Sequence, residues 1–154
     1  MAPRTKPKQA KKKASYLYWA IVIASVLGTI VALYLWIYKI TNASAMCLGS
    51  GDCAIVNESP FSEIRGIPVS VLGLIAYLFI LGVTLLERKS RFLMEYGPML
   101  TMAVSLSGVV FSAYLTYIEV YVIYAICPFC IASAVIITAI FALAVIRLVE
   151  QFTA

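Results

Sequence analysis

Histidine is absent from this chain of 154 residues, and charged residues make up only 12% of it. The first absence removes the side chain that most often binds metals and most often acts as a general acid or base. The low charge, with a hydrophobic content of 63% and a mean hydropathy of +0.98, excludes an ordinary soluble domain. We therefore expect an integral membrane protein whose partner is the lipid bilayer, with cysteine as the remaining reactive residue.

Four long apolar segments follow one another along the chain. They cover residues 16–40, 67–86, 96–119 and 127–149. Each is close to or longer than the ~20 residues that a helix needs to cross a bilayer. We expect an all-α membrane protein, a four-transmembrane-helix bundle with an extracytoplasmic loop between the first and second helices. This membrane domain would cover 16–149, between a disordered basic tail at 1–15 and a short C-terminal tail at 150–154.

Basic residues are distributed unevenly between the two sides of the expected bundle. All Lys and Arg except Lys39 and Arg65 fall in the N-terminal tail, in the turn after the second segment, or near the C-terminal end. Because cytoplasmic flanks are enriched in Lys and Arg, we expect both termini in the cytoplasm and the 41–66 loop outside. All four cysteines then lie on the extracytoplasmic side. The basic tail next to a membrane span favours anionic lipid over nucleic acid as its partner.

A cleaved signal peptide is the alternative interpretation of the first apolar segment. Ala43, Ser44 and Ala45 resemble the small residues of a cleavage site. However, the apolar run is longer than the about 7 to 15 residues typical of a signal peptide. We therefore expect this segment to remain as a membrane span.

The third segment carries small and hydroxyl-bearing side chains at intervals of three or four residues. Its members are Thr101, Ser105, Gly108, Ser112, Thr116 and Glu119. Such residues let helix backbones approach closely in lipid, so this stripe predicts a seam between two helices. Glu119 is its least typical member.

Cys127 and Cys130 form a CxxC motif at the start of the fourth segment, with Pro128 and Phe129 between them. Pro128 suits the first position of a helix, where its missing N–H would have no partner. A helix N-terminus favours a thiolate and so lowers the pKa of a thiol. We expect Cys127 near this terminus, Cys130 one turn deeper, and a pair competent for thiol–disulfide exchange.

The second pair, Cys47 and Cys53, flanks the polar, glycine-rich sequence LGSGD in the first outer loop. Such a loop is able to close a small disulfide ring and to move. A mobile pair could carry electrons between a soluble protein and the CxxC motif by successive thiol–disulfide exchange. The depth of Cys130 favours an electron acceptor dissolved in the lipid.

Four other interpretations compete with this one. Cys47 and Cys53 could be ordinary buried small residues, although their polar, glycine-rich setting disfavours this. Both pairs could be structural disulfides of a non-catalytic membrane scaffold, although a CxxC loop is too short to stabilise much. A zinc site is disfavoured because the five residues between Cys47 and Cys53 exceed the usual spacing. A transporter is disfavoured because the centres of the four segments lack ionisable residues. We expect a metal-free thiol oxidoreductase, with the scaffold as the alternative.

These motifs, in this order, resemble the vitamin K epoxide reductase family, and its prokaryote-type members in particular. The resemblance covers 16–149 and rests on CLGSGDC, on Gly66-Ile67-Pro68 followed by Gly73, and on Cys127-Pro128-Phe129-Cys130. It implies a quinone reductase without heme or metal, in a prokaryotic plasma membrane. Such an enzyme passes electrons from a thioredoxin-like extracytoplasmic or periplasmic protein to a quinone of the menaquinone or ubiquinone type, and so supports disulfide-bond formation.

The resemblance also implies a role for each cysteine. Cys47 would exchange with the partner, Cys53 with Cys127, and Cys130 would face the quinone and react with it. Many prokaryote-type relatives carry a fused thioredoxin-like domain, and the end of this sequence predicts a separate partner instead. Val69 and Ala134 stand approximately where vertebrate members have an asparagine and a tyrosine that contact the quinone, so epoxide reduction is not expected.

Overall fold

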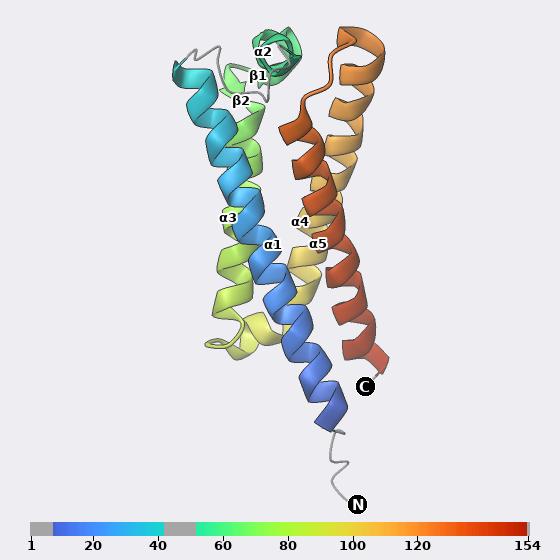
Figure 1. The fold of residues 1–154 in the computed structure, drawn as a ribbon. Helices are drawn as coiled ribbons and strands as arrows, with labels where there is room; N and C mark the ends of the chain where they lie inside the picture. The colour runs from blue at the N-terminus through green and yellow to red at the C-terminus, as the bar shows by residue number, and fades with distance from the viewer. Residues whose placement is uncertain (1–7, 42–51, 154) are drawn as a thin grey trace, which may run out of the picture.

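The computed structural model describes residues 8–41 and 52–153 and shows a bundle of four long helices (Figure 1). The helices are α1 (Lys8–Thr41), α3 (Val69–Leu86), α4 (Arg91–Ile118) and α5 (Pro128–Thr153). Each is long and apolar enough to cross a membrane. The expected all-α transmembrane bundle is therefore confirmed.

Shorter elements between α1 and α3 lie together at one end of the bundle, which we call the α2 end (Figure 1). They are helix α2 (Asp52–Glu58), the 3-10 helix η1 (Pro60–Ser62) and a hairpin of strands β1 (Glu63–Ile64) and β2 (Ile67–Pro68). Arg65 and Gly66 both have positive φ, 52° and 83°, as a two-residue hairpin turn requires. The sequence analysis predicted only a loop here.

Helix α1 begins at Lys8, and so residues 8–15 are helical where a disordered tail was expected. That expectation is wrong for these residues, because Lys, Ala and Gln are good helix formers and extend the membrane helix N-terminally. The Lys13 ammonium also pairs with the Glu150 carboxylate at 2.7 Å. The expected tail at 1–7 lies outside the described residues.

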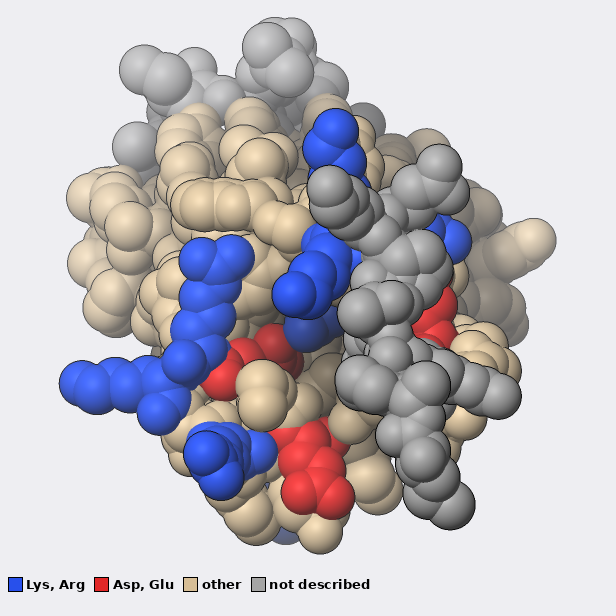
Figure 2. Space-filling model, turned by 90° about the horizontal axis from the view of Figure 1, so that it is seen from below, with Lys and Arg blue, Asp and Glu red and all other residues tan. Residues whose placement is uncertain are grey.

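The end of the bundle opposite α2 is the end where α1 begins and α5 ends (Figure 1). Viewed from this end, blue Lys and Arg side chains surround a few carboxylates (Figure 2). At the α2 end, the described basic residues are Lys39 and Arg65, and the acidic residues there include Glu58 and Glu63. The charge asymmetry found in the sequence thus becomes an asymmetry between the two ends of the folded bundle.

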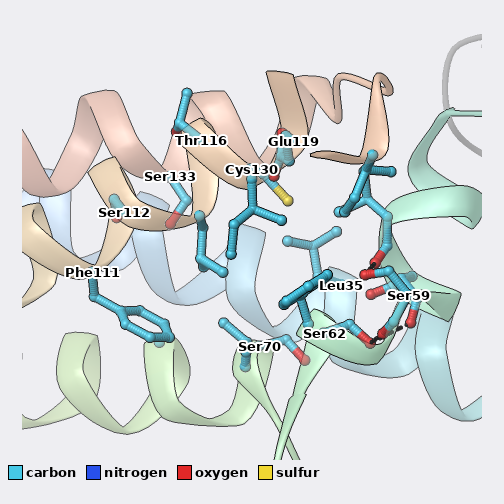
Figure 3. Close-up of a pocket in the computed structure, with 18 of the residues that line it drawn as sticks. Leu35, Ser59, Ser62, Ser70, Phe111, Ser112, Thr116, Glu119, Cys130 and Ser133 are labelled. Carbon is cyan, nitrogen blue, oxygen red and sulfur yellow. Dashed lines mark hydrogen bonds between the residues drawn. The ribbon is translucent and has the colours of Figure 1, made fainter. Parts of the chain in front are cut away.

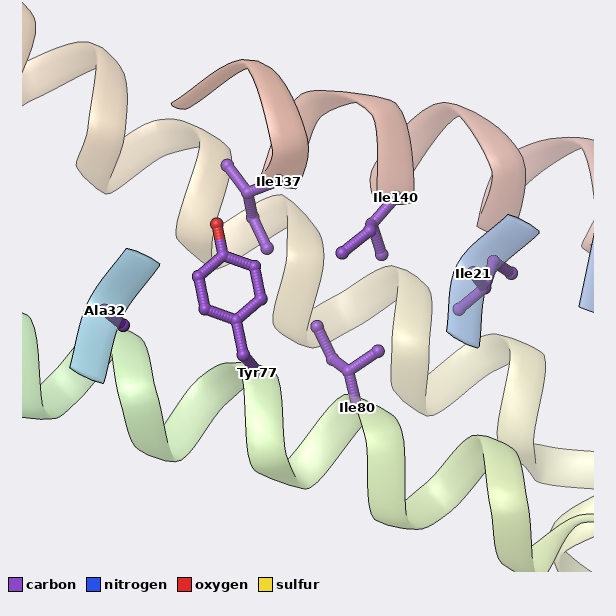
Figure 4. Close-up of a cluster of buried hydrophobic side chains, with 6 residues drawn as sticks. All are labelled: Ile21, Ala32, Tyr77, Ile80, Ile137 and Ile140. Atoms are coloured by element: carbon purple, nitrogen blue, oxygen red, sulfur yellow. The ribbon is translucent and has the colours of Figure 1, made fainter. Parts of the chain in front are cut away.

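The core of the bundle lies where α1, α3 and α5 meet, and its centre is Tyr77 (Figure 4). Its buried side chains are Ile21, Ala32, Tyr77, Ile80, Ile137 and Ile140. The Tyr77 hydroxyl donates a hydrogen bond to the Ser133 carbonyl oxygen at 2.9 Å. This satisfies the one polar atom of a side chain that is only 2% exposed.

Gly28 of α1 faces the Tyr77 ring directly. A Cβ atom built at Gly28 would lie 2.3 Å from a carbon of the Tyr77 ring, which is far inside van der Waals contact. A ring held by its own hydrogen bond and by the core has no free space into which it can move. The absence of a side chain at Gly28 therefore sets how closely α1 and α3 pack.

Gly28→Ala is expected to destabilise the bundle by about 1–3 kcal/mol, the usual cost of overpacking a well-packed core. Thermal unfolding of the detergent-solubilised protein measures it. Gly82→Ala is the matched control, because a Cβ there meets nothing within 4 Å. Equal melting temperatures for the two variants would contradict the close packing of Gly28 against Tyr77.

The stripe of small residues on α4 divides into two parts. Thr101 and Ser105 are fully buried, and a Cβ at Gly108 would lie 2.7 Å from the Ile137 side chain of α5. This part is a helix–helix seam, as predicted. Ser112, Thr116 and Glu119 instead line a cavity near the α2 end, so the predicted seam is wrong for them.

A buried ion pair joins the turn after α3 to α5 at the end opposite α2. The Arg147 guanidinium donates to the Glu87 carboxylate at 2.8 Å, and the Glu87 side chain is 5% exposed. Burial raises the pKa of Glu87, and the hydrogen bond and positive charge of Arg147 oppose that rise. Removing Arg147 leaves burial unopposed, and the pKa of Glu87 then rises further.

Arg147→Met is expected to cost about 3–5 kcal/mol near neutral pH, because it leaves an uncompensated buried charge. When a carboxyl has a higher pKa in the folded than in the unfolded state, the folded protein loses stability as the pH rises through the interval between the two pKa values. The loss should therefore be larger at about pH 8 than at about pH 5, where a larger fraction of Glu87 is protonated. Thermal unfolding at both values, with exposed Arg91→Met as control, checks this; a pH-independent loss contradicts it.

Candidate active site

Cys53 and Cys127 are in contact at the α2 end. Cys53 lies on α2 and is 2% exposed, and Cys127 directly precedes α5 and is 1% exposed. Their sulfur atoms are 3.1 Å apart. The sequence predicts a mobile polar loop at Cys53, and this prediction is wrong because the residue is helical and buried. Cys47 lies outside the described residues, so its predicted exchange role stays a prediction.

The three described cysteines differ in their bonding. Cys53 is in a disulfide bond, whereas Cys127 and Cys130 are free thiols. The distance of 3.1 Å between the sulfurs of Cys53 and Cys127 exceeds the about 2.05 Å of a disulfide, so this contact is not covalent. The Cys127 thiol is the donor, because a disulfide sulfur carries no proton. A free thiol thus lies against a disulfide sulfur, which is the starting arrangement for thiol–disulfide exchange.

Local sequence fixes Cys127 at the N-terminus of α5. The Ile131 N–H donates to the Cys127 carbonyl oxygen at 3.1 Å, which is the first hydrogen bond of the helix. Pro128 takes the first helical position, as predicted. The Phe129 ring packs on Tyr34 of α1, with centroids 4.8 Å apart, and this contact sets the orientation of the CxxC turn.

The pKa of the Cys127 thiol is lowered from its ordinary value. The main cause is a hydrogen bond that the Cys130 thiol donates to the Cys127 sulfur. The backbone N–H groups of Cys130 and Phe129 lower it further, whereas burial and the negative charge of Glu119 oppose the shift. A larger thiolate fraction makes Cys127 the nucleophile of the pair.

Glu119 is a residue of the site that the sequence analysis assigned to the helix seam. It begins a π-helical turn, η2 (Glu119–Ile123), and is only 4% exposed. Its carboxyl accepts a hydrogen bond from the Cys127 N–H at 3.4 Å and lies within hydrogen-bonding reach of the Cys130 thiol (Figure 3). One signal for it was present in the sequence: Glu119 is the sole acidic residue of the 96–119 segment.

A cavity of about 130 Å³ lies beside Cys130 and Glu119 (Figure 3). Its walls are largely apolar, with Leu35, Phe111 and Leu115 among them. A cavity of about 150 Å³ with apolar walls binds one benzene molecule, so this space suits a single aromatic ring. Val69 lines the cavity, whereas Ala134 lines a separate groove between α4 and α5.

Two residues that line the cavity each carry a buried polar atom without a hydrogen-bond partner among the described residues. These atoms are the side-chain nitrogen of Asn57 on α2 and the hydroxyl of Ser70 on α3. A buried donor without a partner costs free energy, and such groups are rare in folded proteins. These two donors therefore suit a ligand that carries acceptor oxygens on an aromatic ring.

Lys39 holds the α2 end together around this cavity. Its ammonium donates to the Asn57 carbonyl oxygen at 3.0 Å and to the Ser62 hydroxyl at 2.6 Å, and it pairs with Glu63 at 3.1 Å. These bonds tie the end of α1 to α2 and to the hairpin. They fix the position of α2, which carries Cys53 and the cavity-lining residue Asn57.

One family model matches the chain over residues 19–145, and its description reads "Vitamin K epoxide reductase family". The matched range is most of the chain and contains all four cysteines and Glu119.

Proposed function

The chain belongs to the vitamin K epoxide reductase family, and from this premise we propose that it is a membrane oxidoreductase which passes electrons from a dithiol protein through two cysteine pairs to a quinone. The observation that carries the proposal is the 3.1 Å contact between Cys53 and Cys127 beside a cavity that Cys130 lines. The Cys53 disulfide thus contacts the reactive Cys127 thiol, and the other cysteine of the CxxC pair, Cys130, lines a cavity of the size of an aromatic ring.

The proposed path begins with the dithiol partner, a thioredoxin-like protein, which exchanges with Cys47. Cys53 then exchanges with Cys127, and electrons reach the CxxC pair as the bond between Cys127 and Cys130 opens. After this step Cys53 is in a disulfide and Cys127 and Cys130 are free thiols, which are the oxidation states found in the structure. The reduced CxxC pair is then ready to give its electrons to an acceptor in the cavity.

The cavity fits the head group of a quinone of the menaquinone or ubiquinone type. Bound there, a quinone accepts two electrons and two protons. Asn57 on α2 and Ser70 on α3 would donate hydrogen bonds to its oxygens, since their buried polar atoms have no partner among the described residues. Cys130 presents its sulfur to the ring, and the electron pair leaves the protein as Cys127 and Cys130 close their disulfide.

We further propose that the α2 end faces the extracytoplasmic side. The described Lys and Arg residues are concentrated at the other end, which the excess of basic residues on cytoplasmic flanks assigns to the cytoplasm. The partner would then be an extracytoplasmic or periplasmic protein, and the reaction would support disulfide-bond formation in a prokaryotic plasma membrane.

Quinone binding is tested by Asn57→Leu and Ser70→Ala in the purified protein, with a short-chain quinone and dithiothreitol. Each variant is expected to raise the KM for quinone about fivefold, the effect of losing one net hydrogen bond, and to leave the KM for the dithiol unchanged. Ser107→Ala is the matched control, because Ser107 is exposed and, among the described residues, its hydroxyl bonds to the Ala103 carbonyl oxygen of its own helix. Unchanged KM values for quinone in both variants would place the quinone elsewhere. A wild-type protein that reduces no quinone would contradict the proposed function and favour the alternative, a non-catalytic membrane scaffold.

A further inference from the structure

Glu119 occupies a place that a structural role explains poorly. The bond from the Cys127 N–H to its carboxyl is 3.4 Å long, at the weak end of the range for such bonds. A neutral amide or hydroxyl side chain could accept this bond without placing an acidic group in an apolar site. Among the described residues no ion pair includes Glu119, and no Lys or Arg lines the cavity.

The backbone around Glu119 holds the carboxyl in this place. The π-helical turn closes with the Tyr124 N–H donating to the Glu119 carbonyl oxygen, and the Ala125 N–H donates to the same oxygen at 3.1 Å. Such π turns occur often at functional sites. The carboxyl is thereby directed between the Cys127 backbone and the Cys130 thiol, at the wall of the cavity.

Three acidic groups share this small space: the thiols of Cys127 and Cys130 and the Glu119 carboxyl. The groups that face Glu119 are these two cysteines, Cys127 just before α5 and Cys130 in its first turn. Cys53 on α2 is disulfide-bonded and carries no proton. A site of low dielectric without a cation disfavours two negative charges at once. If Cys127 reacts as a thiolate, Glu119 therefore holds a proton.

We propose that Glu119 is a catalytic residue of the quinone step, which stores the proton released by Cys127 and then donates it to the acceptor in the cavity. The step starts from a thiolate at Cys127, a thiol at Cys130 and a protonated Glu119. Cys130 and Glu119 give up the two protons that convert the quinone oxygens into hydroxyls. The two sulfurs give up two electrons as their bond forms. The site carries one negative charge throughout, on Cys127 before the step and on Glu119 after it.

The proposal rests on quinone reduction as the function of the site, and the test separates the two. Wild type, Glu119→Gln and Glu119→Asp are compared in two half-reactions of the purified full chain. In the first, dithiothreitol reduces the oxidised CxxC pair, followed by counting free thiols. In the second, the reduced protein is mixed with a short-chain quinone without added dithiol, and quinol formation is followed by absorbance. Glutamine preserves size and hydrogen bonding but carries no transferable proton.

Glu119→Gln is expected to slow the quinone half-reaction by about 10²–10³-fold, the usual contribution of a general acid. Reduction of the CxxC pair should change by less than about threefold, since Cys127 leaves that exchange as a thiolate and needs no proton from Glu119. Glu119→Asp should regain part of the quinone rate. Equal slowing of both half-reactions, or an undiminished quinone rate in Glu119→Gln, would overturn the proposal. A wild-type protein that fails to reduce quinone would instead overturn the proposed function.

Discussion

Cys130→Ser is expected to abolish quinone reduction, with a loss of about a thousandfold or more, as for removal of a catalytic nucleophile. Cys130 is the cysteine that lines the cavity, and serine there is unable to close a disulfide with Cys127. The electron pair then has no route out of the CxxC motif. Stopped-flow absorbance of the reduced variant mixed with a short-chain quinone measures the effect.

The companion variant shows whether the fold survives this change. Cys47→Ser/Cys130→Ser keeps only Cys53 and Cys127, whose sulfurs are 3.1 Å apart. Mild oxidation should join these two cysteines rapidly, and peptide mass spectrometry identifies the bond. If the Cys130→Ser protein still forms quinol at the wild-type rate, Cys130 takes no part in quinone reduction.

Cys53→Ser is expected to have the second largest effect, and only with a protein donor. Cys127 is 1% exposed beneath α2, so a folded protein is unable to reach it. With reduced thioredoxin as the donor, quinone reduction should fall by about a thousandfold, the typical loss when a covalent relay is broken. With dithiothreitol as the donor, the loss should be much smaller, because a small dithiol enters where a protein does not.

The ratio of the two donor rates is the informative quantity for Cys53→Ser. Cys53→Ala serves as a second variant, since it removes the thiol without adding a hydroxyl to a buried position. If thioredoxin-dependent turnover survives in both variants, Cys53 does not lie on the electron path. If turnover with both donors falls equally, Cys53 acts on the fold of the α2 end rather than as a relay.

The sequence predicted the parts of the fold that depend on local signals. Long apolar runs determined the four helices, because any segment in lipid must satisfy its backbone within itself. Pro128 marked the start of α5, since proline fits the first turn of a helix and disfavours later turns. The placement of Cys127 before the helix and Cys130 one turn inside followed from that single residue.

The sequence did not predict features that depend on tertiary contacts. Residues 52–58 fall within the predicted 41–66 outer loop. Their helix forms where Lys39, distant in sequence, holds the Asn57 carbonyl oxygen and the hairpin. Glu119 continues the helical spacing of the α4 stripe, so periodicity alone assigned it to the seam. The π turn that begins at Glu119 changes the helical period there, and the carboxyl meets the CxxC motif instead.

The most direct test of the account is a single turnover of the purified, fully reduced protein with one equivalent of short-chain quinone in the absence of oxygen. Quinol is measured by absorbance, and disulfides are mapped by mass spectrometry after rapid acid quenching. We expect quinol and a Cys127–Cys130 disulfide in a one-to-one ratio at early times, with a disulfide at Cys53 forming only later. Quinol formed while Cys127 and Cys130 remain thiols, or no quinol at all, would contradict it.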